Sequence, residues 1–371
     1  MTSLKDLRTP ALIVDLERVE ANAARMQENA RRMGARLRPH VKTHKTLEAA
    51  RIQTRDGFQG ITVSTLAEAE FFKAGGFDDI TYAFPITAAK LPAVAEIQDG
   101  IDFHIVVDHP AQIRAVEHYA ERHRMRFSVL LEIDCGYGRS GVPWHTSRPL
   151  RLARRLDDSR HTAFQGLITH AGQSYAAPNP PKITKIARKE QENLGKLLQR
   201  LQEVDIDCPT VSVGSTPTCS LFVEELEAAN EIRPGNYIFY DRTQADLQSC
   251  RPEDCAVSVL STVVSHYPGR NEMLIDAGAL ALSKDRGLVR DARQEIVYGV
   301  GLDHPHLRVE SISQEHGIVG SKNNIDFHQF PIGTRLRIIP NHSCLTAAGF
   351  PEYHVFDTQG FKEVWKPVRG W

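Results

Sequence analysis

The first 250 residues alternate short apolar runs with longer stretches of helical periodicity, and this alternation limits the fold more than any other feature. Repeated strand–helix units form parallel sheets, because a strand parallel to its predecessor needs a long crossover connection. The runs that fit strands are residues 36–40, 60–63, 79–83, 102–107, 127–133, 164–168, 210–213 and 237–240. Such a series predicts a (β/α)8 barrel, in which chemistry gathers at the carboxyl ends of the strands. An open, doubly wound sheet is the alternative.

The clearest helix lies near the start of the chain. Apolar residues recur there at spacings of four and three, at Val19, Ala23, Met26, Ala30 and Met33. This spacing places them on one face of a helix, which must then be buried. Asp15 is a suitable N-cap, and Gly34 stands where the helix should end.

The pattern changes after Cys250. Runs at residues 257–266, 272–280, 335–339, 352–357 and 363–368 alternate or are rich in β-forming residues, and Gly, Pro, Asn and Asp separate them. No strong helical period appears, so we expect an antiparallel β domain. The predicted organisation is a barrel over residues 12–250 and a C-terminal β domain over residues 251–371, which residues 1–11 join. The length of 371 residues agrees with two domains, since single cores seldom grow beyond roughly 250–300 residues.

Charge and composition exclude several classes of function. Lys and Arg number 45 against 46 Asp and Glu, and no basic tract occurs, so we expect no nucleic acid partner. No stretch approaches the roughly 18 apolar residues of a membrane span, and the N-terminus lacks the apolar core of a signal peptide. We therefore expect a cytoplasmic protein with no membrane partner. The six cysteines form no Cys-x-x-Cys pair, which predicts reduced thiols rather than a disulfide framework.

A lysine ends the first predicted barrel strand, in the segment Arg38-Pro39-His40-Val41-Lys42-Thr43-His44-Lys45. Two imidazoles and a second lysine flank it. An amine that is close to other cations and partly desolvated has a lowered pKa, which is the condition for forming an imine with a carbonyl compound and for acting later as a base. The alternative is a solvated basic turn that opens the next helix.

Other predicted strand ends carry residues suited to a planar, phosphorylated ligand. Two segments could supply backbone N–H groups and hydroxyls to a phosphate: Val213-Gly214-Ser215-Thr216-Pro217-Thr218 and Arg233-Pro234-Gly235-Asn236-Tyr237. Arg139 could bind a phenolate or carboxylate, and His170 or Tyr175 could stack on a ring or hydrogen-bond to it. The alternative for each of these residues is an ordinary turn.

His342 and Cys344 lie two positions apart in the segment Pro340-Asn341-His342-Ser343-Cys344. In an extended segment, residues i and i+2 point to the same side, so these side chains could share one metal ion. Imidazole with thiolate suits Zn²⁺, and a site with few protein ligands leaves positions for water or substrate. With 16 histidines in the chain, a packed cysteine beside a surface histidine is the alternative.

The order of these motifs, along nearly the whole chain, resembles the D-serine dehydratase-like, fold-type III pyridoxal-phosphate enzymes. This family includes D-serine dehydratase, D-threo-3-hydroxyaspartate dehydratase and D-threonine aldolase. Its most specific elements here are His40-Val41-Lys42 and Pro340-Asn341-His342-x-Cys344, and the supporting ones are Thr9-Pro10-Ala11 and residues 60–65, 169–172, 212–216, 234–237 and 315–317. The resemblance implies an alanine-racemase-like (β/α)8 barrel followed by an antiparallel β domain.

The resemblance also implies roles for single residues. Lys42 would form the imine with pyridoxal 5'-phosphate. The positions expected around the phosphate are matched by Ser215, Thr216, Gly235 and Asn236. The residues beside the cofactor ring in alanine racemases are similar to Arg139 and His170, with Tyr175 as a further cofactor contact. Arg233 matches the arginine that faces the pyridine nitrogen in alanine racemases, a position at which this family varies.

The metal pair separates the branches of the family. The dehydratases resemble this chain in carrying His-x-Cys, whereas the D-threonine aldolases carry Asp at the second place and use a harder divalent ion. Cys344 therefore favours Zn²⁺ and β-elimination. D-serine would give pyruvate and ammonia, with Lys42 taking the α proton and zinc assisting loss of the β-hydroxyl.

Three alternatives to this reaction stay open. Two are enzymes of the same family, a D-threo-3-hydroxyaspartate dehydratase and a metal-dependent D-threonine aldolase. The third belongs to a different class, a non-catalytic pyridoxal-phosphate-binding protein. By analogy with fold-type III enzymes we expect a homodimer, and its substrate would be a small D-amino acid.

Overall fold

The computed structural model of the protein describes residues 3–55, 57, 60–288 and 296–371. The chain divides into two units. The barrel unit comprises Arg25–Gly235 with Val368–Trp371, and the β unit comprises Met1–Ala24 with Asn236–Pro367. The predicted boundaries at residues 12 and 250 differ from this division. Residues 12–24 and 236–250 group with the β unit, because the first strand pairs there and Phe239 O and Asn341 O accept backbone hydrogen bonds within it.

Parallel strands circle the barrel unit. Among the described residues the order is β2 (Arg36–Leu37), β10 (Glu231–Ile232), β9 (Thr210–Val213), β8 (Thr162–Ile168), β6 (Phe127–Asp134), β5 (Asp102–Val107), β4 (Asp79–Pro85) and β3 (Ile61–Val63). A parallel bridge between His40 and Thr62 joins the end of β2 to β3, so the order returns on itself. The short β7 (Val142–Pro143) pairs only with β6. This confirms the predicted barrel and excludes the open, doubly wound sheet.

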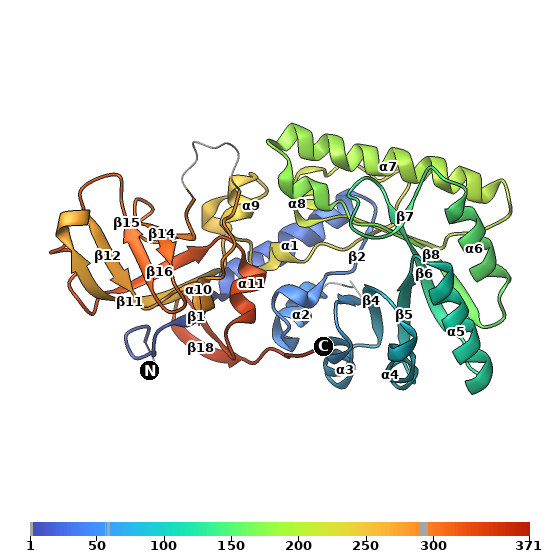
Figure 1. Cartoon of the computed structure of the whole chain (residues 1–371), viewed down its shortest axis with the longest axis horizontal. Coiled ribbons are helices and arrows are strands. Elements are labelled where there is room, and N and C mark those ends of the chain that lie inside the picture. The colour runs from blue at the N-terminus through green and yellow to red at the C-terminus, as the bar shows by residue number, and fades with distance from the viewer. Residues whose placement is uncertain (1–2, 56, 58–59, 289–295) are drawn as a thin grey trace. The chain divides into compact units, whose positions relative to one another are not determined.

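Helices follow most of these strands. They are α2 (Leu47–Gln53), α3 (Leu66–Ala74), α4 (Leu91–Ile97), α5 (Pro110–His123), α6 (Arg148–Asp158), α7 (Pro180–Gln202) and α8 (Thr216–Leu221), with 3₁₀ turns η1 (Val41–Thr43), η2 (Ala88–Lys90) and η3 (Gly172–Ala176). Figure 1 shows α5 and α6 along the outer side of β5, β6 and β8. In α7, Asn179 accepts a cap hydrogen bond from Lys182 N at 3.0 Å, and apolar residues at helical spacing are buried.

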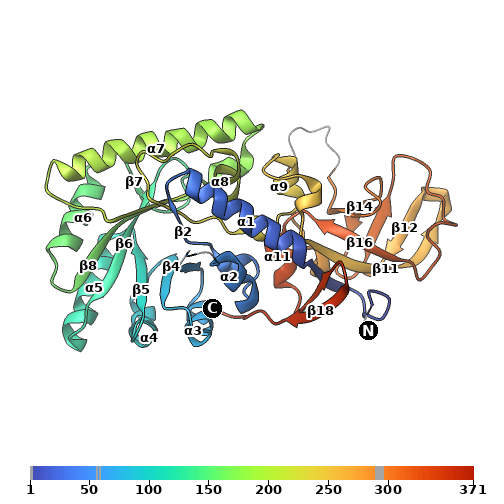
Figure 2. The ribbon, with the colours of Figure 1, turned by 180° about the vertical axis from the view of Figure 1, so that it is seen from behind.

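The predicted first helix is α1 (Leu16–Arg32), the long dark-blue helix in Figure 2. Its five predicted apolar residues, Val19, Ala23, Met26, Ala30 and Met33, are all buried. Asp15 Oδ1 accepts a hydrogen bond from Arg18 N at 3.1 Å, and Gly34 has a φ of 63° just beyond the last turn. The predicted cap and stop of this helix are therefore confirmed.

The β unit contains one long sheet, drawn mainly in orange in Figure 1. Its described strands run in the order β12 (Glu272–Ile275), β15 (Gly317–Gly320), β14 (Arg308–Ile312), β13 (Gly299–Gly301), β16 (Arg335–Pro340), β11 (Val257–Tyr267), β1 (Ala11–Asp15), β17 (Tyr353–Asp357) and β18 (Gly360–Trp365). A further pairing of β12 with β11 closes the stretch from β12 to β11 into an antiparallel barrel. The N-terminal strand β1 joins the sheet beside β11, although only its first residue, Ala11, lies in the segment 1–11 that was expected to join this unit.

Short helical turns account for the errors in the predicted strands. Residues 237–240 form no strand, because the 3₁₀ turn η4 (Asn236–Ile238) occupies this place and Tyr240 N donates to Asn236 O at 2.8 Å. The eighth barrel strand is instead β10. The run 272–280 breaks after Ile275 and ends in α10 (Ala279–Leu282). The remaining helical elements of the β unit are α9 (Arg242–Asp246), α11 (Ser343–Ala348), η5 (Pro252–Asp254) and η6 (Pro268–Arg270).

Two expectations about the whole chain can be compared with the described residues. None of the helices in those residues combines the length and the apolar character needed to cross a bilayer. All six cysteines lie in the described ranges and are free thiols, three of them buried, as predicted.

Candidate active site

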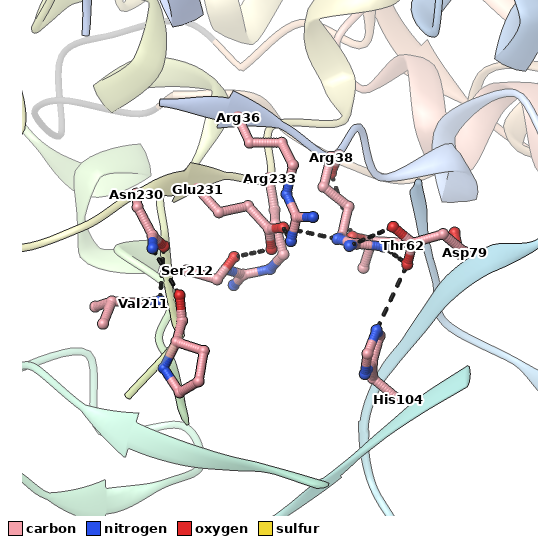
Figure 3. A network of polar contacts seen from close by, with 11 residues as sticks. Arg36, Arg38, Thr62, Asp79, His104, Val211, Ser212, Asn230, Glu231 and Arg233 are labelled. Atoms are coloured by element: carbon pink, nitrogen blue, oxygen red, sulfur yellow. Dashed lines mark hydrogen bonds and ion pairs between the residues drawn. The ribbon is translucent and has the colours of Figure 1, made fainter. Parts of the chain in front are cut away.

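A network of buried charges crosses the interior of the barrel (Figure 3). Arg38 at the end of β2 donates from Nε to Glu231 Oε2 at 2.8 Å, and its two terminal nitrogens donate to Asp79 at 2.5 and 2.8 Å. Burial opposes the charge of Arg38, but Glu231 and Asp79 outweigh it and raise its pKa. Because Arg38 is only 1% exposed, these bonds fix the backbone that leads to His40 and Lys42.

Arg233 extends this network towards the strand ends. Its Nη1 donates to Ser212 Oγ at 2.6 Å, and its Nη2 donates to Thr169 O at 2.5 Å. Ser212 Oγ in turn donates to Glu231 Oε1 at 2.5 Å. The guanidinium is therefore anchored to β8, β9 and β10 at once. Burial lowers the pKa of Arg233, and Glu231 and then Glu190 oppose this effect.

Lys42 lies in η1, directly after β2, as the sequence predicts. The prediction that it is partly desolvated is wrong for this chain by itself, because its side chain is exposed. Its charge acts on the imidazoles of His40 and His170. Burial first, and then Lys42 and Arg233, lower the pKa of His40 well below its usual range. Burial first, and then the charges of Lys42 and Arg139, lower the pKa of His170 to about 3.

A ring of aromatic and cationic side chains surrounds His170. Its Nδ1 donates to Gly214 O at 3.1 Å, so that Nε2 carries the lone pair. The rings of Tyr137 and Tyr175 lie 5.9 and 6.4 Å from it, and the Arg139 guanidinium lies 5.6 Å from the Tyr137 ring. The structure thus brings together the predicted residues Arg139, His170 and Tyr175.

Tyr137 is a residue of this group that the sequence analysis did not single out. A Cβ at Gly172 would collide with its ring, so a glycine is required where the ring packs on η3. The sequence feature that could have pointed to Tyr137 is its position between two glycines, in the segment Gly136-Tyr137-Gly138 after a predicted strand. We expect an aromatic residue so placed to face whatever occupies the mouth of the barrel.

The predicted phosphate segments lie at the ends of β9 and β10. Ser215 is the N-cap of α8, where its hydroxyl lies 2.8 Å from Ser174 Oγ. A Cβ at Gly235 would lie 2.8 Å from His40 O, so the backbone at this point runs directly against the end of β2. Because β2, β10, β9 and β8 are consecutive in the barrel, Lys42, Gly235, Ser215, Thr216 and His170 share one edge of it.

This edge of the barrel suits an anionic, aromatic cofactor. Two lysine or arginine cations, Lys42 and Arg139, are exposed there beside the buried Arg233. Buried polar atoms also lack a hydrogen-bond partner among the described residues, namely His40 Nδ1 and Gln173 Oε1. Such atoms are costly unless a ligand or water pairs with them. The residues present therefore fit pyridoxal phosphate, which carries a phosphate, a phenolate and an aldehyde.

The predicted phosphate residue Asn236 directs its side chain elsewhere. Its Nδ2 donates to Asp241 Oδ2 at 2.6 Å and to Ser343 Oγ at 2.9 Å, and it lies 3.6 Å from Cys344 Sγ. All of these partners belong to the β unit. The side-chain amide nitrogen of Asn236 is therefore used within the β unit. A contact between the backbone of Asn236 and the phosphate stays a prediction.

The predicted metal pair lies where β16 leads into α11. The segment was expected to be extended as far as Cys344, and this is wrong: the backbone of His342 is extended, but α11 begins at Ser343, so Cys344 lies in its first turn. The two side chains nevertheless interact. Burial lowers the pKa of His342, but Asp285, Cys344 and Asp241 outweigh it and raise that pKa to about 11. An imidazole, a thiol and two carboxylates therefore create a place that favours a cation.

The donor set fits a metal with open coordination positions. Imidazole and thiolate are the ligands that zinc prefers. Among the described residues no group of three or more His, Cys, Asp or Glu side chains could hold a metal, so His342 and Cys344 would be the protein's only ligands from this part of the chain. A substrate or water could complete the coordination, as in catalytic zinc sites.

Comparison with known proteins assigns both units to described families. The family model "Alanine racemase, N-terminal domain" matches residues 14–243, and the model "Putative serine dehydratase domain" matches residues 256–356. D-threo-3-hydroxyaspartate dehydratase from Delftia is 39% identical over 100% of this chain and 99% of its own length. D-serine dehydratase from Dictyostelium discoideum is 38% identical over 99% of this chain and 98% of its own length.

Solved structures agree with these matches. The Delftia dehydratase superposes with a TM-score of 0.95 at 37% identity, covering 100% of both chains. A cysteine-to-alanine variant of that enzyme, in a metal-free form, has the same TM-score, identity and coverage. D-threonine aldolase from Filomicrobium marinum superposes with a TM-score of 0.87 at 26% identity, covering 98% of this chain and 96% of its own.

Proposed function

Because this chain belongs to the D-serine dehydratase-like family of fold-type III pyridoxal-phosphate enzymes, we propose that it is a zinc-dependent dehydratase of 3-hydroxy D-amino acids, with D-serine as its first candidate substrate. The products would be the 2-oxo acid and ammonia. The observation that carries this proposal is the set of residues at one edge of the barrel. Lys42, Gly235, Ser215 and His170 lie there on four consecutive strand ends, together with the cations Arg139 and Arg233.

The residues of the barrel unit have distinct proposed roles. Pyridoxal phosphate, when bound, supplies a conjugated ring that delocalises negative charge from the α carbon of the substrate. Lys42 Nζ would hold the cofactor and then take the α proton, from its place directly after β2. Arg233, held by Ser212 and Thr169, would present a fixed guanidinium to the ring nitrogen.

Further residues would bind the periphery of the cofactor. The Arg139 guanidinium would pair with an oxygen of the ring, and His170 and Tyr175 would line its faces. Ser215, Thr216 and the Gly235–Asn236 backbone would hold the phosphate at the ends of β9 and β10.

In the β unit, His342 and Cys344 would hold Zn²⁺. A bound zinc ion would stabilise the negative charge that develops on the leaving hydroxyl oxygen. The thiolate is the reason for proposing zinc rather than a harder ion. The metal-free form of the Delftia variant indicates that this related enzyme binds a metal.

Two reactions compete with this proposal inside the family. A D-threo-3-hydroxyaspartate dehydratase is supported by the 39% identity to the Delftia enzyme, which is close to the 38% identity to the Dictyostelium D-serine dehydratase. A D-threonine aldolase is supported more weakly, at 26% identity for the solved Filomicrobium structure. A non-catalytic cofactor-binding protein of similar barrel fold would need neither His342 nor Cys344.

One assay separates these reactions. Purified protein is loaded with pyridoxal phosphate and incubated with D-serine, D-threo-3-hydroxyaspartate or D-threonine, while 2-oxo acid, ammonia and glycine are measured with and without a chelator. The dehydratase proposal expects 2-oxo acid and ammonia, lost on chelation and restored by Zn²⁺. Glycine with an aldehyde contradicts it in favour of an aldolase. No product from any substrate contradicts it in favour of a binding protein.

The proposed assembly is a cytoplasmic homodimer. Its support is analogy with fold-type III enzymes, in which two subunits contribute to each active site. Sedimentation equilibrium of the cofactor-loaded protein tests it, and a mass equal to one chain at micromolar concentration would contradict it.

A further inference from the structure

His342 is held by a carboxylate that the sequence analysis did not single out. Its Nδ1 lies 2.9 Å from Asp285 Oδ2. A carboxylate can only accept a hydrogen bond, so Nδ1 carries the hydrogen and the lone pair of the neutral ring lies on Nε2. The contact therefore selects one of the two nitrogens for any metal that His342 binds.

Asp285 is itself fixed on several sides. Its Oδ1 accepts from Gly287 N at 2.9 Å, so both carboxylate oxygens have a defined partner. Its backbone oxygen accepts from Asn341 Nδ2 at 2.9 Å, and Asn341 directly precedes His342 in the chain. The carboxylate and the imidazole are thus tied to each other by side chain and by backbone, which limits rotation of the imidazole ring.

Cys344 has a weaker contact of this kind. The Nδ2 of Asn236 lies 3.6 Å from Cys344 Sγ and 2.6 Å from Asp241 Oδ2. Because Asp241 can only accept, the NH₂ group of Asn236, and not its oxygen, must face this side. Nδ2 also donates to Ser343 Oγ at 2.9 Å, so its two hydrogens are shared among three acceptors, and the sulfur receives only a weak share of an N–H group.

We propose that Asp285 is the positioning residue of the metal pair, orienting His342 so that Nε2 binds the divalent ion. This inference rests on the metal site of the proposed function. Asp285 would act through His342, because its two oxygens are already used by His342 and Gly287. In metalloproteins, loss of such a carboxylate partner typically weakens metal affinity by about 10–100-fold.

The test measures zinc affinity rather than turnover. Metal-free, cofactor-loaded protein competes with a chromophoric chelator for Zn²⁺, and the dissociation constant is compared between the wild type, Asp285→Ala and Asp285→Asn. We expect the constant to rise by about 10–100-fold for the alanine variant. The asparagine variant keeps an oxygen acceptor for the Nδ1–H group of His342. Its dissociation constant for zinc should therefore lie between those of the wild type and the alanine variant. Saturating zinc should restore most of the turnover of both variants.

A matched control is available in the same unit. Glu352 lies 3.6 Å from His354 Nε2 and forms a second carboxylate–histidine pair that plays no part in the proposed site. Glu352→Gln should leave the zinc affinity unchanged. The melting temperature of each variant in the presence of chelator reports on folding alone, and we expect it to be the same for Asp285→Ala as for the wild type.

Several results would overturn the proposal. Wild-type affinity in Asp285→Ala would do so, as would a loss of affinity matched by a fall in the melting temperature of the metal-free protein. A wild type that binds no zinc would refute both the metal pair and this role. A wild type that binds zinc but produces no 2-oxo acid would refute only the proposed reaction, because the affinity comparison would stand.

Discussion

Two basic residues, four positions apart at the end of β2, have opposite surroundings. Arg38 is buried and shared by two carboxylates, whereas Lys42 is exposed among imidazoles and arginines. The difference follows from the chemistry of the two groups. A guanidinium bridges two carboxylates with fixed geometry, whereas the ammonium group of a lysine is a compact charge on a flexible stem that can lose its proton and react. Arg38 therefore supports the end of β2, and Lys42 is the group for which we propose the reactive role.

The structural role of Arg38 can be measured by its removal. Arg38→Met leaves the buried Glu231 and the half-buried Asp79 without this guanidinium, and we expect the free energy of unfolding to fall by about 3–5 kcal/mol. Arg36→Met is the matched control, because Arg36 also contacts Glu231 but is 46% exposed, and it should cost less than about 1 kcal/mol. Urea unfolding at pH 7 tests both, and equal losses would contradict the account.

Glu190 gives the barrel a predicted dependence on pH. Burial raises the pKa of this carboxyl from 4.5 to about 7, since Arg233 and Thr169 only partly offset the cost of burying its charge. The folded state thus keeps the proton to a higher pH than the unfolded state. Its contribution to stability is complete below pH 4.5 and is lost as the pH rises to about 7.

Replacing Glu190 by glutamine should remove the loss of stability that occurs as the pH rises. We expect Glu190→Gln to raise the free energy of unfolding at pH 8 by up to about 3 kcal/mol, and to change it little at pH 4.5. Glu192→Gln, two positions along the same helix and fully exposed, serves as the control. A Glu190→Gln variant with the wild-type slope between pH 5 and 8 would contradict the prediction.

The sequence revealed those site residues whose chemistry is unusual by itself. Lys42 at a strand end and the His342–Cys344 spacing are visible without a fold, because few structural needs place such groups together. Asp285 is not visible, since it lies 57 positions from His342 and only folding brings the two into contact. Tyr137 was hidden for a different reason, because an aromatic residue in a glycine-rich turn has many ordinary explanations.

At the scale of elements, the strand ends were predictable and the short turns were not. The run Tyr237–Tyr240 is apolar and aromatic, and every residue of it is buried. When every residue of a segment is apolar and buried, apolar and polar residues do not alternate, so the sequence pattern cannot distinguish a strand from a helical turn. Tyr240 has a φ of 48°, which no strand allows and no sequence pattern signals. The true eighth strand, β10, has only two residues and was too short to find.

The junction of β10 with the phosphate segment makes a testable claim about Gly235. Its φ is not positive, so the requirement for glycine comes from packing, since a Cβ would lie 2.8 Å from His40 O. Backbone atoms cannot give way as a side chain would. We expect Gly235→Ala to cost about 1–3 kcal/mol and to weaken binding of pyridoxal phosphate, because the ends of β2 and β10 must separate.

Unfolding and cofactor titration of the same preparation test this claim. Gly269→Ala is the matched control, because no atom lies within 4 Å of the added Cβ, and it should change stability by less than about 0.5 kcal/mol. Wild-type cofactor affinity in a destabilised Gly235→Ala protein would show that this junction does not shape the phosphate site.

At the scale of the whole molecule, composition and alternation predicted two units, with a boundary near residue 250. The N-terminal strand β1 pairs with β11, about 250 positions later, and with β17 near the other terminus. Pairing over such distances leaves no local trace in a sequence. The family models divide the chain between residues 243 and 256, near the predicted boundary, whereas the division of the folded chain falls at residues 24 and 235.

The central claim is that one particular amine carries the cofactor. Lys45, three positions beyond Lys42, is the natural comparison, because its Nζ pairs with Glu68 Oε1 at 2.8 Å. Reduction of the cofactor-loaded protein with borohydride, followed by digestion and mass spectrometry, locates the attachment. The account predicts the added mass on Lys42 alone. Added mass on Lys45, or on no lysine of a protein that binds the cofactor, would contradict it.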